Sequence, residues 1–402
     1  MSKFIRVLFA SILLGLSACT GIAPAITTDT PSVLPVTSVP TDEPTATFVP
    51  TASPTDIPIA TSTPVIPQAD NETIKAQVDK LAAWFIGQGR NPGLGVAIVV
   101  RNPQTGVLEA TLLNYGTTAK DNGQPVTSDT VYEIGSITKV FTGILLAEAV
   151  GSGEVQLDDP IQKYLPPGIH APEFESESIT LVELATHRSA LPRDPGTDSM
   201  SDLYSWLNTF EPNHAPGSEY AYSNLGYALL GDILARLSGM DFDTLEFQSV
   251  SLPLGLMDTR ETLNADQIGR LAHGYTYDGS PADYFPQSGA LSSAGYMHST
   301  LNDMTRFLIA NMQLDSSPLA APITLAQTLE AGGRNAGQGA ALGWDINELG
   351  SKDESLSKGG ATLGFTSYIS FRSDGSSGFV LLTNGMNVES LVPHMQRIMS
   401  GQ

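Results

Sequence analysis

The stretch EIGSITKVFTGILLAEAV, residues 133–150, places a lysine inside a nearly unbroken apolar run. From Ile137 onward, apolar residues recur at helical spacing through positions 140, 141, 144, 145 and 149. A Gly-Ser-Gly sequence follows and indicates where the helix ends. The pattern predicts a mostly buried helix with Ser136 at its N-terminus and Lys139 one turn further along the same face.

Ser136 and Lys139 are the residue types of an activated nucleophile. A serine hydroxyl is a weak nucleophile until an adjacent base takes its proton, and backbone N–H groups at a helix N-terminus can stabilise an oxyanion. Lys139 is a base only when uncharged, and burial together with a second cation can lower a lysine pKa that far. The alternative is a lysine whose charged end reaches solvent. The Ser-x-x-Lys spacing also recurs at Ser355 and Lys358, so spacing alone leaves both interpretations open.

Two further segments carry polar residues in a related order. PGSEYAYSNLGYALLG contains Tyr222-Ser223-Asn224, the only Tyr-x-Asn sequence in the chain. SKGGATLGFTSY contains Lys358-Gly359-Gly360 and leads into a hairpin pattern. Together with the Ser-x-x-Lys sequence, these segments resemble the three motifs of the serine β-lactamase and penicillin-binding-protein superfamily. The resemblance is to the branch around class C β-lactamases and D-alanyl-D-alanine carboxypeptidases, and it covers roughly residues 72–400.

The resemblance implies a role for each reactive side chain. Ser136 would be the nucleophile, and Lys139 would share its proton with Tyr222. Tyr222 would act as general base in one half-reaction and as general acid in the other, because two lysines lower the pKa of its phenol. Lys358 would supply part of that positive field. The structural alternative is that Tyr222 is an ordinary amphipathic core tyrosine.

The resemblance also implies the substrate contacts. Asn224 would hydrogen-bond a substrate amide, although an asparagine here could instead cap the following helix. The N–H groups of Ser136 and Ala361 would form the oxyanion hole, with Gly359 and Gly360 on the same strand. Gly359 stands where relatives usually carry a threonine, whose hydroxyl helps to hold a substrate carboxylate. Because this hydroxyl is missing, the expected substrate is a short ester or an atypical peptide amide rather than a β-lactam.

Three other residues invite a functional interpretation. His187 in LATHRSALP could be a triad base, but the segment matches one that is structural in the superfamily. Ala190 occupies a position where relatives usually have glycine. Glu211 resembles the deacylating glutamate of class A β-lactamases, yet its surroundings fit the other branch, so it is given no role. The chain has no Gly-x-Ser-x-Gly sequence, and an α/β-hydrolase nucleophile elbow is therefore unsupported.

The remaining pattern predicts an α+β fold. Strand-like runs form one hairpin near the start, at 93–100 and 107–116, and FTSYISF and GFVLLTN form another near the end. Between them, over about 151–335, strand-like runs are absent and helical patterns fall at 180–186, 200–209, 224–238, 301–312 and 322–330. We expect one antiparallel sheet from both chain ends, flanked by helices, with a mainly helical region inserted, as in the β-lactamase/transpeptidase-like fold.

The N-terminal part of the chain differs from the rest. Residues 1–18 combine two basic residues with a short apolar run and are typical of a secretory signal peptide. LSAC, at 16–19, resembles the lipobox of bacterial lipoproteins and implies lipidation of Cys19, with an ordinary signal peptide as the alternative. Residues 19–70 form a Thr/Pro-rich linker that is expected to be disordered. The folded domain is then 71–402, extracytoplasmic and held at the bacterial cell membrane by its lipid.

Composition excludes several classes of partner. The chain has 20 Lys plus Arg against 42 Asp plus Glu, a net charge of −22, which argues against nucleic acid. Cys19 is the only cysteine, so disulfides within the chain and cysteine-based zinc sites are impossible. The 6 histidines show no ligand spacing, and no metal or cofactor is expected. The expected partner is a small molecule or a peptidoglycan peptide, and the oligomeric state stays open.

Two functions remain. The first is a serine hydrolase or acyl-transferase that works through an acyl-enzyme at Ser136 on a D-aminoacyl peptide, a β-lactam or a short ester. The second is a non-catalytic penicillin-binding or cell-surface interaction protein that retains the fold. The presence together of Ser136, Lys139, Tyr222 and Lys358 favours the hydrolase.

Overall fold

The computed structural model describes residues 72–194, 196–285 and 289–400. The predicted signal peptide, Cys19 and the Thr/Pro-rich linker lie outside the described residues. An eight-stranded antiparallel sheet has the strand order β2-β1-β12-β11-β10-β9-β8-β7. Its strands are β1 (Gly93–Arg101), β2 (Leu108–Gly116), β7 (Ala331–Gly332), β8 (Gly339–Ala340), β9 (Asp345–Asn347), β10 (Ser355–Ala361), β11 (Thr366–Arg372) and β12 (Ser377–Thr383).

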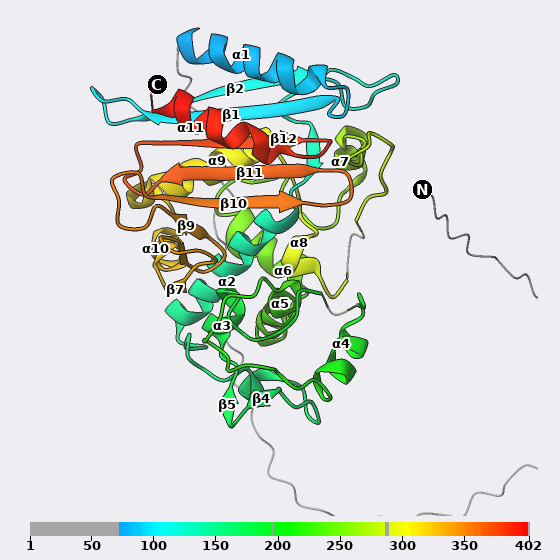
Figure 1. Ribbon diagram of the computed structural model, residues 1–402, viewed down its shortest axis with the longest axis vertical. Helices are drawn as coiled ribbons and strands as arrows, with labels where there is room; N and C mark the ends of the chain where they lie inside the picture. The colour runs from blue at the N-terminus through cyan, green and yellow to red at the C-terminus, as the bar shows by residue number, and fades with distance from the viewer. Residues whose placement is uncertain (1–71, 195, 286–288, 401–402) are drawn as a thin grey trace, which may run out of the picture. The chain divides into compact units, whose positions relative to one another are not determined.

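Both ends of the chain build this sheet. β1 pairs with β2 on one side and with β12 on the other, so that Ile98 lies between Thr111 and Phe379. The cyan β1 accordingly runs beside the red β12 in Figure 1. The predicted α+β fold, with one antiparallel sheet made from both termini, is confirmed.

Helices cover the sheet and fill the inserted region (Figure 1). The α-helices are α1 (Glu72–Gly87), α2 (Thr138–Ser152), α3 (Leu181–Ala185), α4 (Met200–Leu207), α5 (Asn224–Ser238), α6 (Phe242–Glu246), α7 (Ala265–Arg270), α8 (Ser292–Gly295), α9 (Leu301–Met312), α10 (Ala320–Gln327) and α11 (Val392–Met399). Short helical turns are η1 (Gly135–Ile137), η2 (Ile161–Tyr164), η3 (Phe247–Ser251), η4 (Leu314–Ser316) and η5 (Val388–Leu391).

Alternate side chains of β1 enter two separate cores. Leu94, Val96 and Ile98 belong to the core beneath α1 and α11, which pack on one face of the sheet. Ala97 and Val99 belong to the larger core on the other face, where α9 packs. Because each buried side chain of the Val or Leu class contributes about 1.5–3 kcal/mol, burial on both faces anchors this strand firmly.

α2 is buried on nearly every side and contacts α5, α8 and α10. Gly143 permits one very close approach, because a Cβ there would lie 2.0 Å from the carbonyl oxygen of Leu342. That oxygen belongs to the backbone and cannot move aside cheaply, so only glycine fits. The tight packing holds α2, and with it Lys139, in a fixed place behind the sheet.

Two expectations for the inserted region were wrong. Short strands occur there: β4 (Glu173–Phe174) pairs with β5 (Glu177–Ser178), and β6 (His298–Thr300) pairs with β3 (Val131–Glu133). Two or three residues are too few to show the two-residue period of a strand. The helix expected over 322–330 is α10, which begins earlier because a proline is tolerated in a first helical turn.

None of the described helices is long and apolar enough to cross a bilayer. The same residues contain no group of three or more His, Cys, Asp or Glu side chains that could hold a metal ion. Polar side chains gather instead around the N-terminus of α2.

Candidate active site

Ser136 lies in the helical turn η1, between β3 and α2. Lys139 is in the first turn of α2, as its spacing predicted, and its Nζ donates to Ser136 Oγ at 3.3 Å. Ser136 is partly exposed, whereas Lys139 is fully buried. The interpretation of Lys139 as a lysine that reaches solvent is therefore wrong.

The amine of Lys139 has a complete set of acceptors. Besides Ser136, it donates to Asn224 Oδ1 at 2.8 Å and to the carbonyl oxygen of Ala294 at 2.6 Å. Burial lowers the pKa of Lys139, and the positive charge of Lys358 lowers it further, while Tyr222 opposes part of this change. Because the pKa is lowered overall, the uncharged amine of Lys139 is populated at lower pH than that of an ordinary lysine.

Tyr222 completes the contact with the nucleophile. Its Oη lies 2.6 Å from Ser136 Oγ. The Nζ atoms of Lys139 and Lys358 lie 5.0 and 5.8 Å from the centre of its ring. Burial alone would raise the pKa of Tyr222, but the charges of the two lysines outweigh burial and lower it. A larger fraction of Tyr222 is therefore deprotonated near neutral pH than of an ordinary tyrosine, and this phenolate form is the one that can act as a base.

Asn224 does not cap α5, since the side chain of Ser223 accepts the N–H of Gly226 and is the N-cap. The Asn224 side chain instead holds Lys139 through its oxygen and donates from Nδ2 to Asp194 Oδ1 at 2.7 Å. Asn224 thus contacts Lys139, which in turn contacts the nucleophile Ser136.

Lys358 lies on β10 and is only 2% exposed. Its Nζ is 3.3 Å from Asp345 Oδ2 on the neighbouring strand β9. Burial lowers the pKa of Lys358, but the nearby charges of Asp345 and Tyr222 outweigh it, so the pKa is raised overall. Lys358 therefore remains a cation, in contrast to Lys139.

Two glycines bring the Ala361 amide beside the nucleophile. Gly135 has φ +51°, and a Cβ there would lie 2.6 Å from the backbone nitrogen of Ala361. A Cβ on Gly360 would lie 2.0 Å from the carbonyl oxygen of Ile134. Both clashes are with backbone atoms, so larger residues would push β10 away from Ser136.

These residues open into a cleft of about 460 Å³. Of the residues predicted for the site, those that line the cleft are Ser136, Tyr222, Lys358, Gly359, Gly360 and Ala361. Residues that the sequence did not indicate also line it: Arg193, Tyr220, Arg334, Asp345 and Glu389. Only Tyr220 had a local signal, since it lies two residues before Tyr222 in an extended segment and so shares its face.

The other residues considered have structural surroundings. His187 Nδ1 accepts the N–H of Ser223, and the ring packs 4.3 Å from that of Tyr222, so it supports the tyrosine. Ala190 has φ +59°, a left-handed conformation that glycine adopts without strain, which agrees with the glycine that the resemblance implies at this position. Glu211 is exposed and does not line the cleft.

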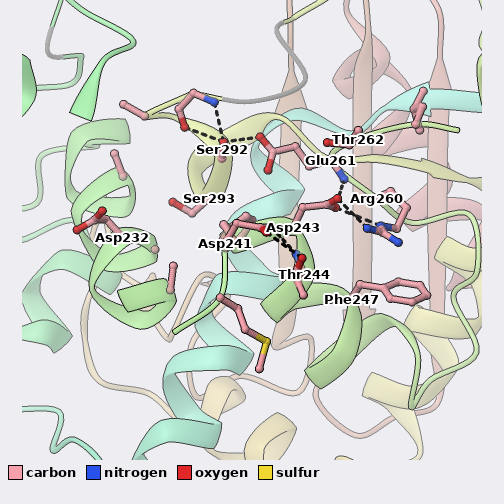
Figure 2. Close-up of a pocket in the computed structure, with 18 of the residues that line it drawn as sticks. Asp232, Asp241, Asp243, Thr244, Phe247, Arg260, Glu261, Thr262, Ser292 and Ser293 are labelled. Carbon is pink, nitrogen blue, oxygen red and sulfur yellow. Dashed lines mark hydrogen bonds and ion pairs between the residues drawn. The ribbon is translucent and has the colours of Figure 1, made fainter. Parts of the chain in front are cut away.

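A larger cavity of about 940 Å³ lies at α5, α6 and α8 and shares no lining residue with the cleft. In Figure 2, Arg260 pairs with Asp243, and Ser292 donates a hydrogen bond to Glu261. Glu261 is 4% exposed, and burial raises its pKa to about 7. No lysine is among the described residues that line this cavity, so Ser292 has no amine to activate it.

Known proteins match this chain by sequence. The family model described as Beta-lactamase matches residues 71–399. The D-alanyl-D-alanine-carboxypeptidase/endopeptidase AmpH of Escherichia coli (strain K12) is 36% identical over 253 residues, which cover 60% of this chain and 63% of AmpH. A β-lactamase of Pseudomonas fluorescens is 30% identical over 295 residues, which cover 72% of this chain and 79% of that enzyme. The match to AmpH thus spans less than two thirds of its length.

Solved structures match the fold. A class C β-lactamase in complex with cefoxitin has a TM-score of 0.74 and 25% identity, over 83% of this chain and 100% of that one. A β-lactamase/D-alanine carboxypeptidase from Pseudomonas syringae has a TM-score of 0.72 and 25% identity, over 81% of this chain and 98% of that enzyme's chain. Since sequence and fold lead to the same relatives over most of the chain, this protein belongs to the β-lactamase family.

Proposed function

We propose that this protein is a serine hydrolase that forms an acyl-enzyme at Ser136 on amide or ester substrates. The observation that carries the proposal is the position of Ser136 Oγ, 2.6 Å from Tyr222 Oη and 3.3 Å from Lys139 Nζ. A nucleophile within hydrogen-bond reach of a base that is itself tuned by cations is the arrangement that covalent catalysis requires.

In the first half-reaction, Tyr222 accepts the proton of Ser136 as Oγ attacks the carbonyl carbon of the substrate. The N–H groups of Ser136 and Ala361 receive the developing oxyanion. The tetrahedral intermediate then expels the leaving group, which takes the proton from Tyr222. The positive charges of Lys139 and Lys358 lie close to Tyr222 and favour its phenolate form.

In the second half-reaction, water takes the place of the leaving group. Tyr222 accepts a proton from the water, the resulting hydroxide attacks the acyl carbon, and Ser136 Oγ departs and recovers the proton. Lys139 shares that proton with Tyr222, because its amine contacts Ser136 Oγ directly. The products are the acid of the acyl group and the free serine.

The names of the relatives indicate candidate substrate classes. Their names include both a D-alanyl-D-alanine carboxypeptidase and β-lactamases, which supports D-aminoacyl peptides and β-lactams as two candidate substrate classes. Short esters are the third, because Gly359 removes a hydroxyl that relatives use to hold a carboxylate.

A non-catalytic penicillin-binding or surface-interaction protein is the competing proposal. It would need the fold but not the tuned set Ser136, Lys139, Tyr222 and Lys358. The lowered pKa of a fully buried lysine is costly to maintain without a use, which supports the hydrolase.

Covalent labelling separates the two functions. The protein and its Ser136→Ala variant are incubated with a fluorescent penicillin and with a fluorophosphonate, and intact masses are followed over time. We expect an adduct in the wild type only, and for the penicillin a loss of the adduct if deacylation is fast. Absence of any adduct would overturn the proposal. Turnover of nitrocefin against p-nitrophenyl acetate then ranks lactams against esters.

We further propose an extracytoplasmic protein with a lipid anchor at Cys19. The lipobox-like LSAC sequence supports this location, and the linker over 19–70 would serve as a tether. Labelling with a palmitate analogue in a bacterial host is expected to mark the wild type and not Cys19→Ala.

A further inference from the structure

One wall of the cleft carries an acidic side chain next to the glycine that replaces threonine. Glu389 lies in η5, which is separated from the end of β12 by four residues, and η5 packs on β11. Its carboxylate oxygen Oε1 is 3.0 Å from the place that a Cβ on Gly359 would occupy. Both residues line the cleft, so a substrate group at Gly359 meets this carboxylate.

The Glu389 carboxylate is available to a ligand. Within residues 72–194, 196–285 and 289–400, no side chain forms an ion pair with it. It is exposed to the cleft, and the partial loss of water there raises its pKa without help from a charged partner. A carboxylate without a cationic partner attracts a cation and repels an anion.

The described cations that line the cleft form no ion pair with Glu389, and its pKa shift has no cause among them. Lys358 pairs with Asp345 on β9, and Arg334 lies in the turn between β7 and β8. Arg193 pairs with Asp194 next to the Tyr222 ring. In the sheet order, β11 and η5 lie on one side of β10, whereas β9, β8 and β7 lie on the other.

We propose that the cleft selects substrates whose leaving group carries a positive charge, held by Glu389 beside Gly359. The proposal rests on the hydrolase function above. A carboxylate on the leaving group would find no side-chain hydroxyl at Gly359 and would face the negative charge of Glu389. Specificity of this kind comes from repulsion as well as attraction, and the Glu389 carboxylate attracts a cationic leaving group and repels an anionic one.

The test uses thioesters that differ only in the charge of the leaving thiol. N-acetyl-D-alanyl thioesters of thiocholine, mercaptoethanol and mercaptopropionate have cationic, neutral and anionic leaving groups. The released thiol is measured with a chromogenic disulfide, and kcat/KM is compared at two salt concentrations. We expect the wild type to prefer the cationic thioester to the anionic one by about tenfold or more, and salt to weaken the preference.

Variants then assign the preference to Glu389. Glu389→Gln is expected to reduce the ratio of cationic to anionic kcat/KM by about tenfold, and Glu389→Lys to invert it. Glu330→Gln is the matched control: Glu330 also has a pKa raised by burial but does not line the cleft, so its removal leaves the ratio unchanged.

The outcomes are distinct. Cleavage of the neutral thioester without any charge preference, or the same ratio in Glu389→Gln as in the wild type, overturns the inference and leaves the hydrolase standing. Cleavage of none of the thioesters, together with no adduct at Ser136, overturns the hydrolase and the inference with it.

Discussion

The two cavities of this protein place serines in opposite environments. In the cleft at Ser136, the serine touches the amine of Lys139 and the phenol of Tyr222, whose pKa values are both lowered. In the larger cavity, Ser292 donates to Glu261, whose pKa burial raises to about 7. The larger cavity has twice the volume, yet none of its described lining residues is a lysine that could activate its serine. Volume therefore says less about catalysis than the direction in which each environment shifts its ionisable groups.

The helix α8 connects the two environments. The carbonyl oxygen of Ala294 accepts the amine of Lys139, while Ser292, two residues earlier, faces the other cavity. Thr142 on α2 donates to the carbonyl oxygen of Ser293, which ties the two helices together. One short helix thus holds Lys139 through Ala294 and lines the larger cavity with Ser292 and Ser293.

Replacement of each serine by alanine is the strongest test of this contrast between the two cavities. Ser136→Ala is expected to lower kcat by at least about a thousandfold, because it removes the atom that forms the acyl-enzyme. Ser292→Ala should stay within about threefold of the wild type, because its hydroxyl lies in the other cavity. Hydrolysis of p-nitrophenyl acetate measures both. Equal losses in the two variants would show that the cavities are not functionally distinct.

The second test concerns the charge of Lys358. Tyr222 acts as base only when deprotonated, and Lys358 helps to lower its pKa. In Lys358→Gln that pKa rises, so the increase of kcat/KM with pH should move to higher pH, with a loss of about 10- to 100-fold at pH 7. Lys352→Gln, which removes an exposed lysine, is the control. An unshifted pH profile in Lys358→Gln would remove Lys358 from the proposed mechanism.

The third test concerns Glu261 in the larger cavity. The pKa of Glu261 is raised from 4.5 in the unfolded chain to about 7 in the folded protein. Between pH 4.5 and pH 7, Glu261 is therefore protonated in the folded state and ionised in the unfolded state. Stability from this group is therefore fully present below pH 4.5 and is lost as pH rises to 7, by up to about 3 kcal/mol. Glu246 and Asp303, whose pKa values are also raised, add their own decline. Glu261→Gln should therefore show a smaller decline than the wild type, and Glu154→Gln should show the same decline as the wild type. Urea unfolding at pH 5 and pH 8 measures the difference, and parallel curves for wild type and Glu261→Gln would contradict it.

The sequence predicted those parts of the molecule that depend on local pattern. The helices over 224–238 and 301–312 have the predicted bounds, since apolar spacing and polar caps mark both ends. The three motif segments do meet around Ser136, Tyr222 and Lys358, although no local pattern fixes their distance. Their resemblance to known motifs supplied that information.

The rest depended on contacts that no local pattern encodes. Asp345 faces Lys358 through the pairing of β9 with β10, and Glu389 reaches Gly359 from a turn after the last strand. The third acceptor of Lys139 is the carbonyl oxygen of Ala294, and a backbone atom has no sequence signal at all. Strand register and backbone placement are products of the whole fold, so single-sequence reasoning does not reach them.

The end of α2 far from the cleft offers the smallest test. The Gly-Ser-Gly sequence predicts the end of the helix, but Gly151 is still helical and only Gly153, with φ +80°, leaves the helix. A Cβ added to either glycine would have no atom within 4 Å, so packing does not distinguish the two positions. Gly151→Ala should therefore stabilise the fold by about 0.5–1 kcal/mol, and Gly153→Ala should destabilise it by about 1 kcal/mol. Thermal unfolding measures both, and activity should not change, because both glycines lie at the opposite end of α2 from Lys139. A matching change in kcat would show instead that α2 transmits strain from its C-terminus to the cleft.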